Sequence, residues 1–96
     1  MVVVVCVFEL HLPEARSLKQ KRKVVKGLVE RLHARYRVSI AETGFHDLHQ
    51  RAEIGVAAVV KSESEGARLL DTLRELVDQE AGAYVTLWEP DWLHVA

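Results

Sequence analysis

The alternation of hydrophobic and polar residues predicts four strands and two helices along this chain of 96 residues. The segment 2–12 begins with β-branched residues and ends with Phe8, Leu10 and Leu12 alternating with polar residues. This pattern is typical of a strand that is buried on both faces at its start and on one face at its end. Pro13 ends the predicted strand.

A helix is predicted from Ser17 to about Arg35. Ser17 followed by Gln20 forms a capping box. The apolar residues that follow fall on one side of a helix with a period of 3.6, and they are Leu18, Val25, Leu28, Val29, Leu32 and Tyr36.

The remaining pattern predicts a strand at 38–43, a loop at 44–50, a strand at 51–60, a helix and a last strand at 83–89. In the third strand, one face holds Ile54, Val56, Ala58 and Val60, and the other holds Gly55 and Ala57. Ser62 and Glu65 form a second capping box, which opens a helix to about Glu80. Gly82 suits the C-terminal end of this helix. Pro90 and Trp92 follow the last predicted strand.

The order strand-helix-strand, strand-helix-strand predicts an α+β fold. Two such units form a ferredoxin-like βαββαβ sandwich, a four-stranded antiparallel sheet with two helices on one face. We expect a single domain over residues 1–96, because no repeat or linker divides the chain.

One face of the predicted sheet has no helix to cover it. If Val4, Cys6 and Phe8 point to the helices, this face carries Val3, Val5, Val7, Ala57 and Val59, together with Val85 and Leu87, and the opposite alternation of the first strand leaves an apolar face as well. An exposed apolar patch usually marks association. We therefore expect a homodimer through the sheet, and the alternative is a monomer whose own tail or loop shields the patch.

The formal net charge of −1 hides a strong asymmetry. Between Arg16 and Arg37 there are nine Lys and Arg residues and a single acid, whereas the rest of the chain is acidic. This polarity indicates an oriented partner. The alternative is a thermostable protein with a densely charged surface, since the chain has no Asn and a single Met.

Localisation is inferred from Cys6 and from the first residues of the chain. Cys6 is the only cysteine and lies in an apolar run, which indicates a structural thiol in a reducing compartment. The segment 1–8 lacks the basic region and cleavage site of a secretory signal and is too short to cross a membrane. We expect a cytoplasmic protein.

The strongest candidate site is the start of the first helix, where five cations cluster: Lys19, Lys21, Arg22, Lys23 and Lys26. Cations oppose the helix dipole there, and like charges three or four residues apart repel one another. A bound anion would reverse both effects. We expect contact with the phosphates of RNA or of a ribosome-related particle. An acidic protein partner and a solvated face are the alternatives. Lys21 falls near the apolar side, so it must snorkel or find a partner.

Other candidates are weaker. His46, Asp47 and His49 offer metal-ligand types, but no further ligand accompanies them, and we expect no metal or other cofactor. Glu42, Asp47 and Arg51 fit either an acid/base site or an ion-pair cluster that holds the loop.

No catalytic motif is recognised, so we expect a non-enzymatic protein. A small hydrolase of phosphate esters or acyl phosphates is the weaker alternative. Arg16 lies where acylphosphatases place an arginine, but no glycine-rich cradle surrounds it. Trp88 and Trp92 fit either an interaction anchor or core packing.

Several short runs together resemble the YlxP-like family of small bacterial proteins. They are the run 17–22 (SLKQKR), 38–42 (VSIAE), 47–52 (DLHQRA) and 55–57 (GVA). The resemblance covers nearly the whole chain and implies a ferredoxin-like fold. It also implies a role linked to translation, since genes of this family often lie among those for translation initiation and ribosome maturation. His49 departs from the family, which often has an aromatic residue there, so a stacking role at this position is not expected. We expect His46, Asp47, His49 and Arg51 to shape the edge of the basic surface.

Overall fold

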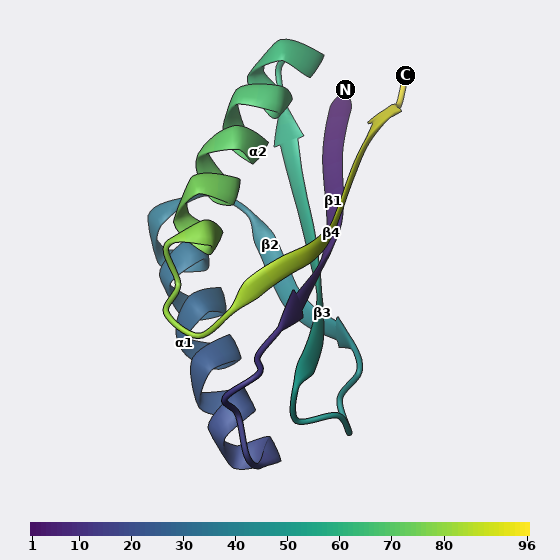
Figure 1. The fold of residues 1–96 in the computed structure, drawn as a ribbon. Helices are drawn as coiled ribbons and strands as arrows, with labels where there is room; N and C mark the ends of the chain where they lie inside the picture. Colours follow the sequence, from purple (N-terminus) through teal and green to yellow (C-terminus); the bar gives the residue numbers. More distant parts are fainter.

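The computed structural model describes residues 1–96 and contains the six predicted elements in the predicted order (Figure 1). They are β1 (Val2–His11), α1 (Leu18–Arg35), β2 (Ser39–Gly44), β3 (Arg51–Val60), α2 (Glu63–Asp78) and β4 (Tyr84–His94). Neither helix is long and apolar enough to cross a lipid bilayer.

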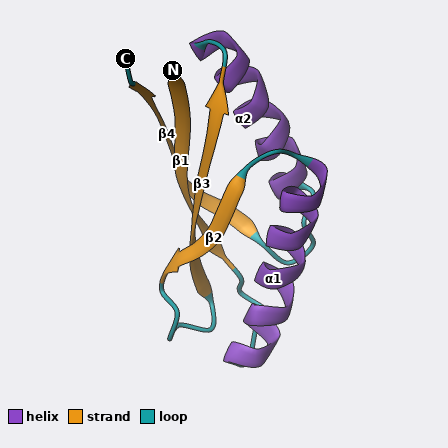
Figure 2. Cartoon of the chain, turned by 180° about the vertical axis from the view of Figure 1, so that it is seen from behind, coloured by secondary structure: helices purple, strands orange, loops and turns teal.

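The four strands form one antiparallel sheet in the order β2-β3-β1-β4. Both helices lie on the same side of this sheet, with α2 over the end that holds the chain termini and α1 over the opposite end (Figures 1 and 2). The two termini lie side by side, and the Val95 amide donates to the Met1 carbonyl at 2.8 Å. This topology confirms the predicted ferredoxin-like sandwich.

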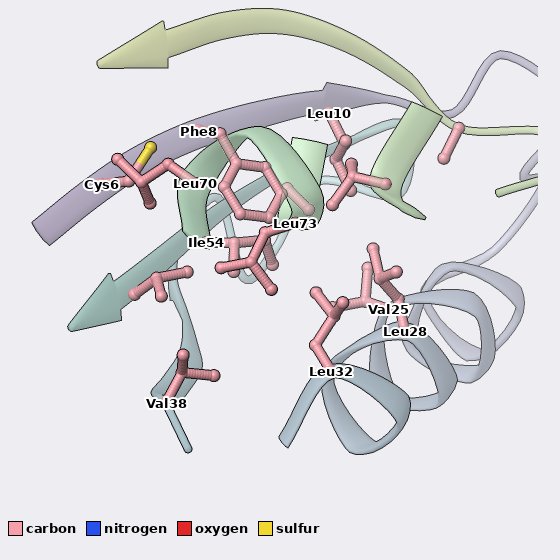
Figure 3. Close-up of a cluster of buried hydrophobic side chains, with 14 of the residues drawn as sticks. Cys6, Phe8, Leu10, Val25, Leu28, Leu32, Val38, Ile54, Leu70 and Leu73 are labelled. Atoms are coloured by element: carbon pink, nitrogen blue, oxygen red, sulfur yellow. The ribbon is translucent and has the colours of Figure 1, made fainter. Parts of the chain in front are cut away.

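The core lies between the sheet and the helices (Figure 3). Alternate residues of β1, among them Cys6 and Phe8, are 1% exposed, and their partners across the pair with β3 are Val56 and Ile54. The two helices contribute leucine and valine side chains to this layer, which are Val25, Leu28, Leu32, Leu70, Leu73 and Val77. The even-numbered positions of β1 therefore face the helices.

Local signals set the bounds of α2. The Ser62 hydroxyl accepts a hydrogen bond from the Glu65 amide at 3.2 Å, as the capping box predicts. The Glu65 carboxylate reaches the Lys61 amide, one residue before the cap, at 3.1 Å. The predicted stop at Gly82 is wrong, because the helix ends at Asp78. Gly82 instead occupies a turn before β4 with φ of 79°, a conformation that favours glycine.

The last strand is longer than predicted. β4 continues to His94, through Pro90, which pairs with Cys6. A proline cannot donate to a neighbouring strand, but β4 is an edge strand and one of its sides has no partner. Pro90 therefore does not end the strand.

The face of the sheet opposite the helices, here called the open face, is largely as predicted. Val3, Val5 and Val7 lie on it, as do Ala57 and Val59, which pair with Val5 and Val3. Leu87 also lies there, since it pairs with Glu9. The prediction that Val85 lies on the open face is wrong. A register shift after Glu9 pairs Val85 with Leu10 and turns its side chain toward the core.

Candidate nucleic-acid interface

The first turn of α1 is a positively polarised end without an acid to balance it. Ser17 caps the helix by accepting a hydrogen bond from the Gln20 amide at 3.1 Å. The Gln20 side chain accepts from the Arg16 amide at 2.6 Å, one residue before the cap. No acidic residue lies in the first turn. The backbone dipoles there remain uncompensated within the chain.

Four cations project from the solvent-facing side of α1: Lys19, Arg22, Lys23 and Lys26, here called the basic face. Three of them have no carboxylate within 4.0 Å; Lys26 alone pairs with Glu30, at 3.9 Å. Both side chains of that pair are well exposed, at 77% and 66%, so solvent screens their attraction. The acids of the chain therefore do not neutralise the basic face.

Lys21 does not belong to this surface, which corrects its predicted role in anion binding. Its side chain is fully buried beneath α1. The ammonium Nζ donates to the Phe45 carbonyl at 2.8 Å and to the Arg51 carbonyl at 3.1 Å. The expectation that Lys21 finds a partner is confirmed, but the partners are internal.

Glu42 supplies the counter-charge for the buried ammonium. Its Oε2 lies 3.1 Å from Lys21 Nζ, and its side chain is 18% exposed. The contact lacks hydrogen-bond alignment, so Oε2 is buried without a hydrogen bond. The attraction is therefore that of a close ion pair, and the directed hydrogen bonds of Lys21 go to the two backbone carbonyls.

The loop between β2 and β3 is fastened at both ends next to the start of α1. Lys21 holds the carbonyls of Phe45 and Arg51, and Phe45 has φ of 58°. The Gln50 side chain donates to the carbonyls of Pro13, at 3.0 Å, and Ala15, at 3.4 Å. The loop is thereby joined to the connection that leads into α1.

The predicted cluster of Glu42, Asp47 and Arg51 does not form. Arg51 pairs instead with Glu9 on the open face, at 2.7 Å, and its guanidinium lies 4.0 Å from the centre of the Phe45 ring. Asp47 is exposed and makes no ion pair. The cause is sheet register, because Arg51 and Glu42 point to opposite faces of neighbouring strands.

The two histidines of the loop between β2 and β3 contact different parts of the chain. His46 Nε2 lies 3.3 Å from the Glu42 carbonyl oxygen, whereas His49 lines a polar hollow of about 700 Å³ with Glu14 and Arg16. No three His, Cys, Asp or Glu side chains come together as a metal-binding group.

The remaining chemically notable side chains lie in or against the core. Burial raises the pKa of the Cys6 thiol to about 11, so it stays protonated at neutral pH. Trp88 and Trp92 both pack against the core, and the Trp88 ring stacks on Phe8 with ring centres 5.1 Å apart. Core packing accounts for both tryptophans.

One residue that the sequence did not single out as a site residue shapes this region, Gln50. Gln50 joins two loops through its amide, which donates to the carbonyls of Pro13 and Ala15. A polar residue directly before a predicted strand was the only local signal for Gln50.

Two designed proteins of known structure are similar to this chain. A designed protein called Foldit4 matches the whole chain with a TM-score of 0.57 at 14% identity, and all of that chain is covered. A second design, LFR1 1, described as having a ferredoxin fold, covers 90% of this chain and 81% of its own at a TM-score of 0.48 and 17% identity.

A natural relative is the uncharacterized protein YlxP of Bacillus subtilis (strain 168). The two are 33% identical over 79 residues, which cover 82% of this chain and 86% of YlxP. The model of the family described as "Protein of unknown function (DUF503)" matches residues 3–89. The chain therefore belongs to the DUF503 family.

Proposed function

We propose that the basic face of α1 binds RNA, or a ribosome-related particle, through phosphate groups and without catalysis. The observation that carries the proposal is that Lys19, Arg22 and Lys23 lie on one exposed side of the first turns with no carboxylate within 4.0 Å. Other exposed cations of the chain are also unpaired, but they are not gathered in this way at a positive helix end.

The energetics of the isolated chain favour an anionic partner. Each cation in the first turn opposes the helix dipole by ~0.3–1 kcal/mol. Lys19 with Arg22 and Lys19 with Lys23 add ~0.2–0.5 kcal/mol of repulsion per pair. Phosphate groups reverse the sign of both contributions, and their release of counterions favours binding further.

Contact with the phosphate backbone fits this surface better than reading of bases. Sheets that bind single-stranded RNA usually present aromatic rings on their central strands. Here the open face of β1 and β3 holds no aromatic residue, because Phe8 points into the core. We therefore expect binding that depends weakly on sequence.

The test is the salt dependence of binding to a fluorescein-labelled RNA hairpin, followed by fluorescence anisotropy. For three or four phosphate contacts, the logarithm of the association constant should fall with the logarithm of the salt concentration with a slope of about −2 to −4. A slope near zero would overturn the proposal.

A variant with Lys19, Arg22 and Lys23 replaced by Gln should bind RNA more weakly and lower the magnitude of the slope by about 2 to 3. The matched control replaces Arg35, Lys61 and Arg68 by Gln, since these are also exposed and unpaired. Both variants have the same net charge. Equal weakening in both would show that net charge, and not the basic face, governs binding.

An acidic protein partner is distinguished by competition. A polyglutamate peptide that displaces the RNA at an equal concentration of negative charge would favour a protein partner and contradict the proposal. For the ribosome-related particle, the wild-type protein should sediment with ribosomal subunits. The triple Gln variant should not.

A further inference from the structure

The open face is hollowed near β2 and carries an exposed leucine at its opposite edge. Near β2 it has a shallow hollow of about 470 Å³, lined by residues that include Val3, Arg37, Ser39 and Val59. On the opposite edge, Leu93 of β4 pairs with Val3 and is 50% exposed. The hollow and the protruding leucine therefore lie at the same level along the strands, on opposite sides of β1.

Two charged residues lie at the same two edges of this face, Asp91 beside Leu93 on β4 and Arg37 beside the hollow near β2. Asp91 of β4 pairs with Val5, whose other neighbour is Ala57, and Ala57 pairs with Ser39. Asp91 makes no ion pair, and its Oδ1 accepts from the Trp92 amide at 2.8 Å. Arg37, beside Ser39 in the hollow, is also without a carboxylate partner. An unpaired acid, Asp91, thus lies at the β4 edge of the face, and an unpaired base, Arg37, lies at the β2 edge.

We propose that a second copy of this chain packs on the open face, related by a two-fold axis parallel to the strands. Such an axis exchanges left and right on the face but preserves the level along the strands. It places Leu93 over the hollow of the partner subunit and Asp91 beside Arg37 of the partner subunit. The valines between them meet across the axis, as in aligned packing of two sheets.

Charge selects this arrangement over the other two-fold packing of the same faces. An axis perpendicular to the strands would stack β4 on β4 and bring Asp91 and Glu89 toward the same acids of the partner subunit. Like charges brought together in this way disfavour association. The strand-parallel axis instead places Asp91 beside Arg37 of the partner subunit at both edges, and it buries Val59, which is 68% exposed in the single chain.

This dimer leaves the basic face of α1 open, because the helices lie on the other side of each sheet (Figure 2). Dimerisation through the open face does not depend on RNA binding. A protein that fails to bind RNA can still dimerise, and a monomeric protein can still bind RNA through the basic face.

Charge reversal tests the packing, with the dissociation constant of the dimer measured by analytical ultracentrifugation. Wild type should sediment as a dimer. Arg37→Asp and Asp91→Arg should each raise the dissociation constant at least about tenfold. The double variant should restore it to within about threefold of wild type, because the pair is re-formed with exchanged signs. Both side chains are exposed in the single chain, so the fold is not at risk.

Leu93→Asp should also give a monomer, whereas the matched control Leu48→Asp should not. Leu48 is 45% exposed but lies in the loop between β2 and β3, at the end of the sheet opposite Leu93. A monomeric wild type overturns the proposal. So does a dimer that survives Leu93→Asp, and so does a double charge reversal that fails to recover association.

Discussion

The Lys21 ammonium lies 3.1 Å from Glu42 Oε2, at the end of a lysine side chain that is fully buried. Lys21 is the only charged residue in the buried set of this chain. It extends from the helix that carries the basic face to the loop between β2 and β3. The cationic cluster on α1 thus combines three exposed lysines and one exposed arginine with one internal lysine that fixes the loop beside them.

We expect Lys21→Met to lower the free energy of unfolding by about 2–4 kcal/mol. The substitution keeps the apolar stem but leaves the Glu42 carboxylate without its counter-charge and two loop carbonyls without their donor. Urea denaturation followed by tryptophan fluorescence measures the change. Lys23→Met is the control on the same helix and should change stability by less than about 0.5 kcal/mol.

The pairing with Glu42 is tested by removing both charges. Lys21→Met combined with Glu42→Leu should recover part of the loss, because a buried charge without a partner costs more than an apolar pair. A double variant whose loss equals the sum of the two single losses would show that Lys21 acts through the backbone carbonyls alone.

The two helices each contain a glycine, and alanine should have opposite effects at the two positions. At Gly27 a Cβ would meet only Arg31 Nη1, at 3.5 Å. Gly27→Ala should therefore raise the free energy of unfolding by about 0.5–1 kcal/mol through helix propensity. At Gly66 a Cβ would lie 2.9 Å from Trp92 Nε1 and 3.1 Å from Val4 Cβ, so Gly66→Ala should lower it by about 1–2 kcal/mol.

Thermal unfolding of both alanine variants in one buffer measures this contrast. A stabilised Gly66→Ala would show that the Trp92 ring moves aside without cost. The Trp92 indole nitrogen is buried without a hydrogen-bond partner, so its side chain is held by packing alone.

Local signals account for the parts of the fold that the sequence predicted well. Ser17 and Ser62 set the helix starts, and the alternation through Phe8 and Ile54 set the buried face of the sheet. The errors arose where tertiary position overrides a local preference. Pro90 continues a strand because β4 is an edge, and Val85 faces the core because the register shifts beside it.

The candidate site could also be predicted only in part from the sequence. Helical periodicity separated Lys21 from the basic face, but periodicity carries no information about which loop lies under that side of the helix. The partners of Lys21 therefore came from the structure, and so did the pairing of Arg51 with Glu9, which depends on strand register. Exposure of Lys19, Arg22 and Lys23 followed from the period alone.

Neutralising the basic face should not destabilise the protein. The variant with Gln at Lys19, Arg22 and Lys23 removes unfavourable dipole and repulsion energies, so its free energy of unfolding should equal that of wild type or exceed it by up to about 1 kcal/mol. The gain should shrink in about 1 M salt, where exposed charges are screened. Thermal melts at low and high salt measure this effect, and a clear loss of stability would assign these cations a structural role.

The buried thiol predicts how stability changes at alkaline pH. Burial raises the pKa of Cys6 from 9.0 to about 11, with smaller opposing effects from the Glu89 backbone and Arg74. In the unfolded chain the thiol loses its proton near its ordinary pKa, whereas in the fold it stays neutral until higher pH. Its contribution to stability is therefore complete below about pH 9 and decreases by at most ~2–3 kcal/mol as the pH rises to about 11.

Cys6→Ala isolates this titration from those of the lysines and tyrosines, which both proteins share. At pH 8 the alanine variant should be less stable than wild type, because it leaves a small cavity in the core. The difference in the free energy of unfolding between the two should narrow as the pH rises from about 8 to about 11, since only wild type loses stability through the thiol. Urea denaturation across this range measures the difference, and a difference independent of pH would mean that the Cys6 thiol ionises as readily in the fold as in the unfolded chain.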